Sequence, residues 1–317
     1  MPYAKSRGAR PHRPERRRAI PRCATPRATE GDGMLRLLVV DGNERAGRER
    51  HVARCGKTSA ETYAGVLRAL AADVACDRVA PADADGDLPV AVEAYDGVVF
   101  TGSTLHVAEG GPAVRRQIEL MRAALEAGVP VFGSCWGVQV AAAVAGGEAG
   151  RNPRGPEYGF ARNIAPTAAG REHPLLAGRP AAYDAPAIHD DAVLTPPPGS
   201  TVLAGNGRLD VQAIEVPYGP GLFWGTQYHP ELDLDEVAAM LCLSAGGVVA
   251  AGLCRGEGDV AAQAEALRAL HADPRGRPDL AWRLGLGEEV TAPERRRREI
   301  RNFLDGLVRP RRVARGR

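Results

Sequence analysis

Short apolar runs alternate with amphipathic segments along the middle of the chain. LRLLVV occupies 35–40, DGVVF occupies 96–100 and VPVF occupies 129–132. Continuous apolar runs of this length are typical of strands buried on both faces of a parallel sheet. Between them, 59–72 and 111–127 carry apolar residues at helical spacing. We also expect a small-residue helix at 138–145 and shorter strands at 201–204, 211–216 and 221–228. The pattern predicts an α/β fold, an open and mostly parallel sheet with flanking helices.

The two ends of the chain differ from this middle part, which we place at 34–244. Residues 1–33 are rich in Pro and Arg and have no apolar periodicity, which predicts a disordered basic tail. Residues 245–317 predict a helical C-terminal extension, with helices at about 258–271, 278–284 and 293–308. In the last helix the apolar residues follow i, i+3, i+4, i+7 spacing: Ile300, Phe303, Leu304 and Leu307. We expect this stripe to pack on the main domain, with a partner protein as the alternative.

The charge is distributed unevenly although the net charge is only +2. Residues 1–33 carry +6 and 291–317 carry +7, which leaves −11 for 34–290. Neither basic end interleaves aromatic side chains with its arginines, so we do not expect nucleic-acid binding. No apolar run approaches the roughly 20 residues of a membrane helix, and the N-terminus lacks the apolar centre of a secretory signal. These features predict a cytoplasmic protein that does not bind membranes.

Metal and nucleotide cofactors find no support in the sequence. The six cysteines form no C-x-x-C pair, which argues against a zinc site and a disulfide scaffold. Gly56-Lys57-Thr58 resembles the end of a phosphate loop, but His51 stands where that loop needs glycine. The adjacent His189, Asp190 and Asp191 are more typical of a solvated loop than of a metal site. We therefore predict no cofactor. His106, His173 and His271 have no apparent partners in the sequence.

The strongest chemical signal is Gly133-Ser134-Cys135-Trp136-Gly137, directly after a predicted strand and before a predicted helix. Glycines on both sides allow a sharp turn, so this arrangement predicts a nucleophile elbow that exposes Cys135. The thiol would lie at a helix N-terminus, whose N–H groups and dipole favour the nucleophilic thiolate. The backbone N–H of Trp136 can then donate to a developing oxyanion.

A histidine base for this nucleophile is predicted in His229-Pro230-Glu231. A cysteine nucleophile needs a group that takes its proton and later protonates the leaving nitrogen. In an extended segment, side chains two residues apart share a face, so Glu231 can reach the imidazole of His229 and orient it.

Together these two motifs resemble the class I, or triad, glutamine amidotransferases, whose signature is G-x-C-x-G-x-Q followed much later by H-P-E. Here the signature reads Gly133, Cys135, Gly137 and Gln139, then His229-Pro230-Glu231. The resemblance spans about 35–242 and is greatest to stand-alone domains similar to the amidotransferase half of GMP synthase.

The resemblance implies roles for further residues. Glutamine would be the substrate, with Cys135 attacking its side-chain amide to form a glutamyl thioester. Gly102, in the loop Thr101-Gly102-Ser103, would supply a second oxyanion donor beside Trp136. Relatives often have Gly-Gly-Pro in that loop, so Ser103 departs from the pattern. Gln139, Ser103 and His189 are the expected substrate contacts.

Three functions remain open from the sequence. The first is an amidotransferase that supplies ammonia to an ATP-dependent synthetase on a separate chain, since the chain lacks a loop for activating an acceptor with ATP. The second is a free-standing γ-glutamyl amide hydrolase that releases a larger amine. The third is a non-catalytic regulatory domain, which the presence of Cys135, His229 and Glu231 disfavours.

Overall fold

A nine-stranded sheet organises the part of the chain that the computed structural model describes, residues 33–84 and 91–316. The predicted tail at 1–33 lies outside these residues except for Gly33. The strand order is β2 (Val74–Val79), β1 (Leu35–Val40), β3 (Gly97–Phe100), β4 (Val131–Ser134), β11 (Gly221–Thr226), β10 (Ala213–Tyr218), β9 (Thr201–Gly205), β6 (Glu157–Pro166) and β7 (Tyr183–His189). The first five strands pair in parallel and the remaining pairs are antiparallel. The predicted open α/β sheet with flanking helices is confirmed.

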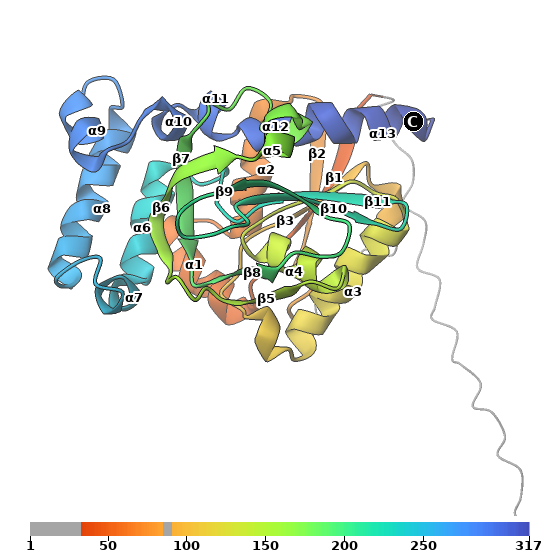
Figure 1. Cartoon of the computed structure of the whole chain (residues 1–317), viewed down its shortest axis with the longest axis horizontal. Helices are drawn as coiled ribbons and strands as arrows, with labels where there is room; N and C mark the ends of the chain where they lie inside the picture. The colour runs from red at the N-terminus through yellow and green to blue at the C-terminus, as the bar shows by residue number, and fades with distance from the viewer. Residues whose placement is uncertain (1–32, 85–90, 317) are drawn as a thin grey trace, which may run out of the picture. The chain divides into compact units, whose positions relative to one another are not determined.

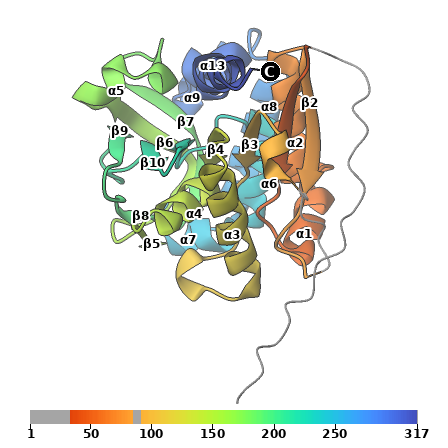
Figure 2. The ribbon, with the colours of Figure 1, turned by 90° about the vertical axis from the view of Figure 1, so that its right-hand side faces the viewer.

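Helices cover both faces of the parallel strands (Figures 1 and 2). Alternate residues of β1 point to opposite faces: Leu37 packs with α2 (Ser59–Leu70), whereas Leu38 packs with α3 (Pro112–Glu126) and α4 (Trp136–Val144). The start of α2 is fixed by a capping box, in which the Thr58 side chain accepts from the Glu61 N–H and the Glu61 side chain accepts from the Thr58 N–H. Strands buried on both sides explain the continuous apolar runs of the sequence.

The remaining elements lie around this sheet. A two-stranded ladder joins β5 (Glu148–Arg151) to β8 (Asp191–Thr195). Helix α1 (Arg45–Cys55) follows β1, helix α6 (Leu234–Leu243) follows β11, and α1 packs against α6. Short helical segments complete the list: α5 (Ala168–Glu172), and single turns at Val92–Ala94, Val107–Glu109 and Pro174–Leu176.

The C-terminal residues form helices, as predicted, and these pack on the main domain. They are α7 (Ala245–Ala250), α8 (Glu257–Ala272), α9 (Pro278–Leu284), α10 (Glu288–Thr291), α11 (Pro293–Arg296), α12 (Arg298–Phe303) and α13 (Arg309–Ala314). The apolar stripe that includes Phe303 is buried in the core beside β4, with the Phe303 and Phe132 rings 5.5 Å apart. The stripe is therefore no free docking surface for a partner.

The prediction of one continuous helix over 293–308 is wrong. The chain breaks between α11 and α12, and Leu304–Val308 widens into a π turn before α13. Pro310 has no N–H to donate and its ring crowds the carbonyl four residues earlier, so a regular helical turn cannot continue there.

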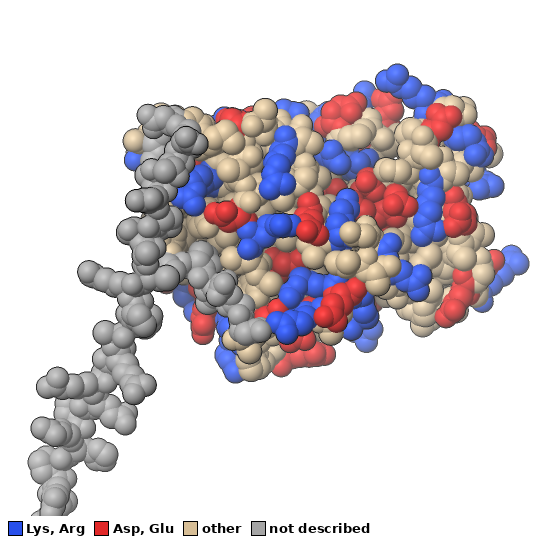
Figure 3. Space-filling view, turned by 180° about the vertical axis from the view of Figure 1, so that it is seen from behind, with Lys and Arg blue, Asp and Glu red and all other residues tan. Residues whose placement is uncertain are grey.

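Positive and negative side chains are interspersed on the face shown in Figure 3. On the described C-terminal helices some arginines pair with acids, as Arg309 does with Asp73 at 2.7 and 2.8 Å, and others donate to backbone carbonyls, as Arg296 does to Val290 at 2.6 Å. Among the described residues, no helix is long and apolar enough to cross a membrane.

Candidate active site

A sharp elbow carries Cys135 between β4 and α4. The backbone of Cys135 has φ +50° and ψ −99°, a strained conformation for a residue with a side chain. A Cβ at Gly133 would lie 2.8 Å from Gly137 Cα, and one at Gly137 would lie 2.9 Å from Phe100 Cβ. Only glycine fits at these two positions, so the flanking glycines of the sequence motif let α4 turn back tightly over the strands.

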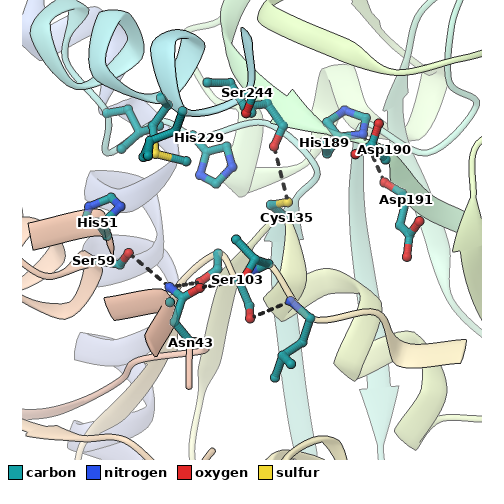
Figure 4. A pocket seen from close by; sticks show the side chains of 18 of the residues that line it. Asn43, His51, Ser59, Ser103, Cys135, His189, Asp190, Asp191, His229 and Ser244 are labelled. Carbon is teal, nitrogen blue, oxygen red and sulfur yellow. Dashed lines mark hydrogen bonds between the residues drawn. The ribbon is translucent and has the colours of Figure 1, made fainter. Parts of the chain in front are cut away.

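His229 and Glu231 lie next to this elbow, after the end of β11. His229 Nδ1 is 2.6 Å from Glu231 Oε1, and the His229 N–H donates to the Pro186 carbonyl at 2.7 Å. Burial lowers the pKa of His229, but the charge of Glu231 and the hydrogen bond with Cys135 outweigh it and raise that pKa to about 10. The imidazole of His229 lies beside the side chain of Cys135 (Figure 4).

A short relay of hydroxyls holds Glu231 in place. Ser134 Oγ donates to Glu231 Oε1 at 3.0 Å, and the Tyr63 hydroxyl donates to Ser134 Oγ at 2.6 Å. Ser134 directly precedes Cys135, so the elbow fixes the positions of both Cys135 and the Glu231 carboxylate.

The loop after β3 faces the same point. A Cβ at Gly102 would lie 2.7 Å from His229 Cε1, so any side chain there would displace the imidazole. The Gly102 carbonyl is held away by Thr101 Oγ1 at 2.8 Å and by Asn43 Nδ2 at 3.4 Å. Trp136 contributes the first N–H of α4, which has no acceptor within the helix. Of the two predicted oxyanion donors, Gly102 lines the cavity, whereas Trp136 directly follows Cys135 and its side chain is fully buried.

A cavity of about 300 Å³ is lined by Cys135, His229, Glu231 and Gly102. Figure 4 shows Cys135 and His229 near its middle, with His189, Asp190 and Asp191 toward one end and His51 and Ser59 toward the other. The second end is built from α1, α2 and α6. The charged pattern of α1 shows no apolar stripe, so sequence analysis did not predict this wall.

The polar end of the cavity holds two of the predicted substrate contacts. Gln139 Nε2 donates to the Asp191 carbonyl at 3.1 Å. His189 lies in the wall, but its Nδ1 contacts that same carbonyl at 3.0 Å and its Nε2 contacts Glu157 at 3.0 Å. Both of its nitrogens are occupied by protein groups, so His189 shapes the wall through its neighbours.

Two further residues named in the sequence analysis have clear positions, the expected substrate contact Ser103 and the histidine His106. Ser103 lines the cavity while its hydroxyl donates to the Gly42 carbonyl at 2.8 Å. His106, for which no partner was expected, lies 2.8 Å from Asp191, and this hydrogen bond raises the pKa of His106. The partner is 85 residues away in sequence, which is why the sequence did not show it.

Comparison with known proteins identifies the family to which the chain belongs. The family model described as glutamine amidotransferase class-I matches residues 54–241. The chain belongs to the class I glutamine amidotransferase family. A γ-glutamyl-L-1-hydroxyisopropylamide hydrolase from a Pseudomonas species is 33% identical over 279 residues, which cover 87% of this chain and 94% of that protein.

Other amidotransferase relatives match a smaller part. One of them, a component of the glutamine-hydrolysing GMP synthase of Ignicoccus hospitalis, is 33% identical over 147 residues, 46% of this chain and 72% of that protein. The structure of a glutamine amidotransferase from Thermotoga maritima has a TM-score of 0.54 at 16% identity and covers 86% of this chain and 98% of its own. At this low sequence identity, the similarity to the Thermotoga maritima structure shows a shared fold only.

Several residues at the site carry no sequence motif that would identify them. Asn43, His51 and Glu157 reach the cavity or its wall from distant segments. Ser134 was part of the quoted elbow motif, yet only the structure shows its contact with Glu231.

Proposed function

We propose that this protein hydrolyses a γ-glutamyl amide, with Cys135 as the nucleophile, His229 as the acid and base, and Glu231 as the group that orients His229. One observation carries the proposal: the elbow cysteine and the buried His229–Glu231 pair open onto a cavity that continues in both directions from them.

The reaction follows from this geometry. The Cys135 thiolate attacks the γ-carbonyl carbon and forms a C–S bond, which makes a tetrahedral oxyanion. The C–N bond then breaks as His229 gives its proton to the leaving nitrogen, and a thioester remains. Water attacks the thioester while His229 removes its proton, and the C–S bond breaks to release glutamate and the thiolate.

The N–H groups of Gly102 and Trp136 are suited to stabilise the oxyanion. Such preorganised donors typically contribute on the order of 10²–10³ in rate. The strained backbone of Cys135 supports this role, because strain of this kind gathers at active sites where the surrounding structure maintains it.

The two ends of the cavity are suited to the two halves of the substrate. Asp190 and Asp191 are carboxylates that complement the α-ammonium of a glutamyl group, and Gln139 lies beside them. The leaving nitrogen must face His229, so its substituent extends toward α1, α2 and α6. This room beyond His229 favours an amine larger than ammonia.

The similarity pattern supports the same choice. The hydrolase from Pseudomonas matches over 94% of its own length, and the match covers 87% of this chain, well beyond the size of the family domain at 54–241. The GMP synthase component matches less than half of the chain.

A second function is favoured by the GMP synthase relative and by the family itself. Glutamine is the smallest γ-glutamyl amide, and the same residues would release ammonia from it for an ATP-dependent synthetase on another chain. Co-purification of such a synthetase from native cells, together with stimulated glutamine turnover, would support this alternative.

Labelling with a glutamine-mimicking diazo-ketone tests the proposal. We expect stoichiometric modification of Cys135, and hydrolysis of γ-glutamyl alkylamides that Cys135→Ala abolishes. Cys242→Ala is the matched control, since Cys242 lies outside the cavity lining, and it should retain labelling and turnover. Labelling that persists in Cys135→Ala would refute the assignment.

A further inference from the structure

The end of the cavity beyond His229 differs in composition from the end that holds Asp190 and Asp191. We call it the distal lobe and define it by lining residues of three helices: Arg50 and His51 of α1, Ser59 and Thr62 of α2, and Met240 and Leu243 of α6. Figure 4 shows His51 and Ser59 on this side of the cavity. The distal lobe therefore combines an aliphatic wall with polar side chains and an arginine.

Arg50 faces the distal lobe because of its place on α1. Gly47, Arg50 and His51 are spaced i, i+3 and i+4, which puts them on one face of the helix, and all three line the cavity. Arg50 is exposed, and within the described residues its side chain makes no hydrogen bond or ion pair. Arg48, two positions earlier, instead pairs with Asp83. Arg50 thus presents unused donors at the border of the cavity.

The polar side chains at this end already bond to the protein. Asn43, which also lines the cavity, accepts at Oδ1 from the Thr104 N–H at 3.1 Å and donates from Nδ2 to Ser59 Oγ at 3.5 Å. Thr62 Oγ1 donates to Glu236 Oε1 at 2.5 Å. These hydrogen bonds hold the loops and helices together, so their groups are less available to a ligand than the guanidinium is.

Arg50 sets the charge of the distal lobe. Burial lowers the pKa of His51, although the nearby charges of Asp41 and Glu236 oppose this, so His51 is uncharged near neutral pH. Glu236 is itself paired with Lys57 at 2.9 Å. The distal lobe is therefore positive, whereas the other end of the cavity carries carboxylates.

A carboxylate is the group that complements Arg50. A guanidinium only donates hydrogen bonds, and its planar fork matches the two oxygens of a carboxylate. An ammonium would be repelled, and a hydroxyl would occupy one donor without neutralising the charge. Met240 and Leu243 supply aliphatic surface for the carbon atoms between the amide nitrogen and that carboxylate, and the side chain of Met240 adapts easily to the shape of a ligand.

We propose that the distal lobe binds a leaving amine that carries a carboxylate and that the Arg50 guanidinium pairs with that carboxylate. This rests on the proposed γ-glutamyl amide hydrolysis and adds a substrate class, the γ-glutamyl amino acids. The bond that breaks joins the γ-carbonyl carbon to the nitrogen of the leaving amino acid, which takes its proton from His229. Opposite charges then meet at both ends, since the α-ammonium of the glutamyl group lies near Asp190 and Asp191.

Two matched pairs of substrates test the assignment. γ-Glutamylglycine is compared with γ-glutamylglycinamide, and γ-glutamyl-β-alanine with γ-glutamyl-β-alaninamide, so each pair differs only by a carboxylate in place of a carboxamide. In the native chain we expect kcat/KM to favour the carboxylate by about 5- to 20-fold in at least one pair, mainly through KM. A charged hydrogen bond at the border of a cavity lies between an exposed ion pair and a buried one in strength. In Arg50→Gln each ratio should fall to within about 2-fold of one.

Two further variants and a change of salt sharpen the test. Arg54→Gln removes an exposed arginine of the same helix outside the cavity lining and should retain the native preference. Arg50→Lys keeps the charge but loses the planar fork, so it should retain part of the preference. Raising NaCl from about 0.05 M to about 1 M should reduce the native preference, because salt screens exposed charges. Thermal unfolding checks that the variants fold, which we expect because both arginines are exposed.

The outcomes separate this inference from the proposed function. Ratios near one for both pairs in the native chain, or a preference that survives in Arg50→Gln, overturn the role of Arg50 alone. Turnover of glutamine without turnover of any of the four larger amides overturns the distal lobe as an amine site. Absence of Cys135-dependent hydrolysis of all five compounds refutes the proposed function itself.

Discussion

Two buried glutamates, Glu231 and Glu299, occupy neighbouring parts of the molecule and are satisfied in different ways. Glu231 is 3% exposed and pairs with His229, whereas Glu299 on α12 is 0% exposed and pairs with Arg179. The two sites are connected through the backbone, because Tyr228 directly precedes His229 and donates its hydroxyl to Glu299 at 2.8 Å.

The hydrogen bonds of the two carboxylates differ. Both oxygens of Glu299 are used, since Arg179 donates twice at 2.7 Å and the Tyr228 hydroxyl adds a third bond. Glu231 Oε1 contacts His229 and Ser134, but its Oε2 has no partner among the described residues. A fully satisfied network fixes structure. The incompletely satisfied carboxylate is the one that lines the cavity, where charge must change during a reaction.

The largest effect should come from the base beside Glu231. His229→Ala should lower kcat by about 10²- to 10⁴-fold, the usual contribution of a positioned general acid and base. The melting temperature should fall as well, because the buried Glu231 loses its cation, so kcat is compared per folded molecule. Steady-state hydrolysis and thermal unfolding measure both. Turnover equal to that of the native chain would exclude His229 as the acid and base.

Removing the partner of Glu299 should lower the free energy of unfolding without a comparable loss of kcat. Arg179→Met would leave a buried carboxylate without its cation, which typically costs about 3–5 kcal/mol. Urea unfolding should show this loss, while activity per folded molecule should fall far less than in His229→Ala. As a control, Arg277→Met removes an exposed pair with Asp279 and should change the free energy of unfolding by less than about 1 kcal/mol.

The sequence predicts the contact that Glu231 makes but not the one that Glu299 makes. Glu231 stands two residues from its histidine, and that local spacing predicts their contact. Arg179 and Glu299 lie 120 residues apart, and nothing local in either segment indicates the pair. The same holds for His51, which belongs to a helix without an apolar stripe. The elbow and the sheet could be predicted because their causes, glycine spacing and apolar runs, are local.

Glu231→Gln should have an intermediate effect on catalysis. The amide can still position His229 but no longer stabilises the imidazolium, so we expect kcat to fall by about 10²-fold, less than for the residue that transfers the proton. Glu299→Gln is the comparison variant. A larger loss of kcat in Glu299→Gln than in Glu231→Gln, measured in folded protein, would reverse the roles assigned to the two carboxylates.

Glu231→Gln should also change how stability depends on pH. The pKa of His229 rises from about 6.5 when unfolded to about 10 when folded. The resulting stabilisation is fully present below pH 6.5 and is lost as the pH rises toward 10. Without the charge of Glu231, the strongest effect that opposes burial is lost, so the pKa of His229 falls and this stabilisation decreases. Urea unfolding at pH 7 and pH 9.5 should show a smaller fall for Glu231→Gln than for the native chain, and equal falls would contradict the assignment.

The smallest effect should arise where the two networks meet. Burial, reinforced by the nearby charge of Glu299, raises the pKa of Tyr228, so its hydroxyl stays protonated and donates to Glu299. The Tyr183 hydroxyl, 2.8 Å away, must then be the donor to Tyr228. Successive side chains of an extended segment point to opposite sides, so the anchor at Tyr228 fixes how His229 projects into the cavity.

Tyr228→Phe should lower kcat by about 3- to 10-fold with little change in KM, because small misplacements of a catalytic group are costly. Tyr183→Phe removes the hydroxyl that donates to Tyr228 but leaves the bond from Tyr228 to Glu299 that anchors the segment, and its kcat should stay within about 2-fold of native. If both variants lose kcat in parallel with their melting temperatures, the network around Glu299 acts on stability alone.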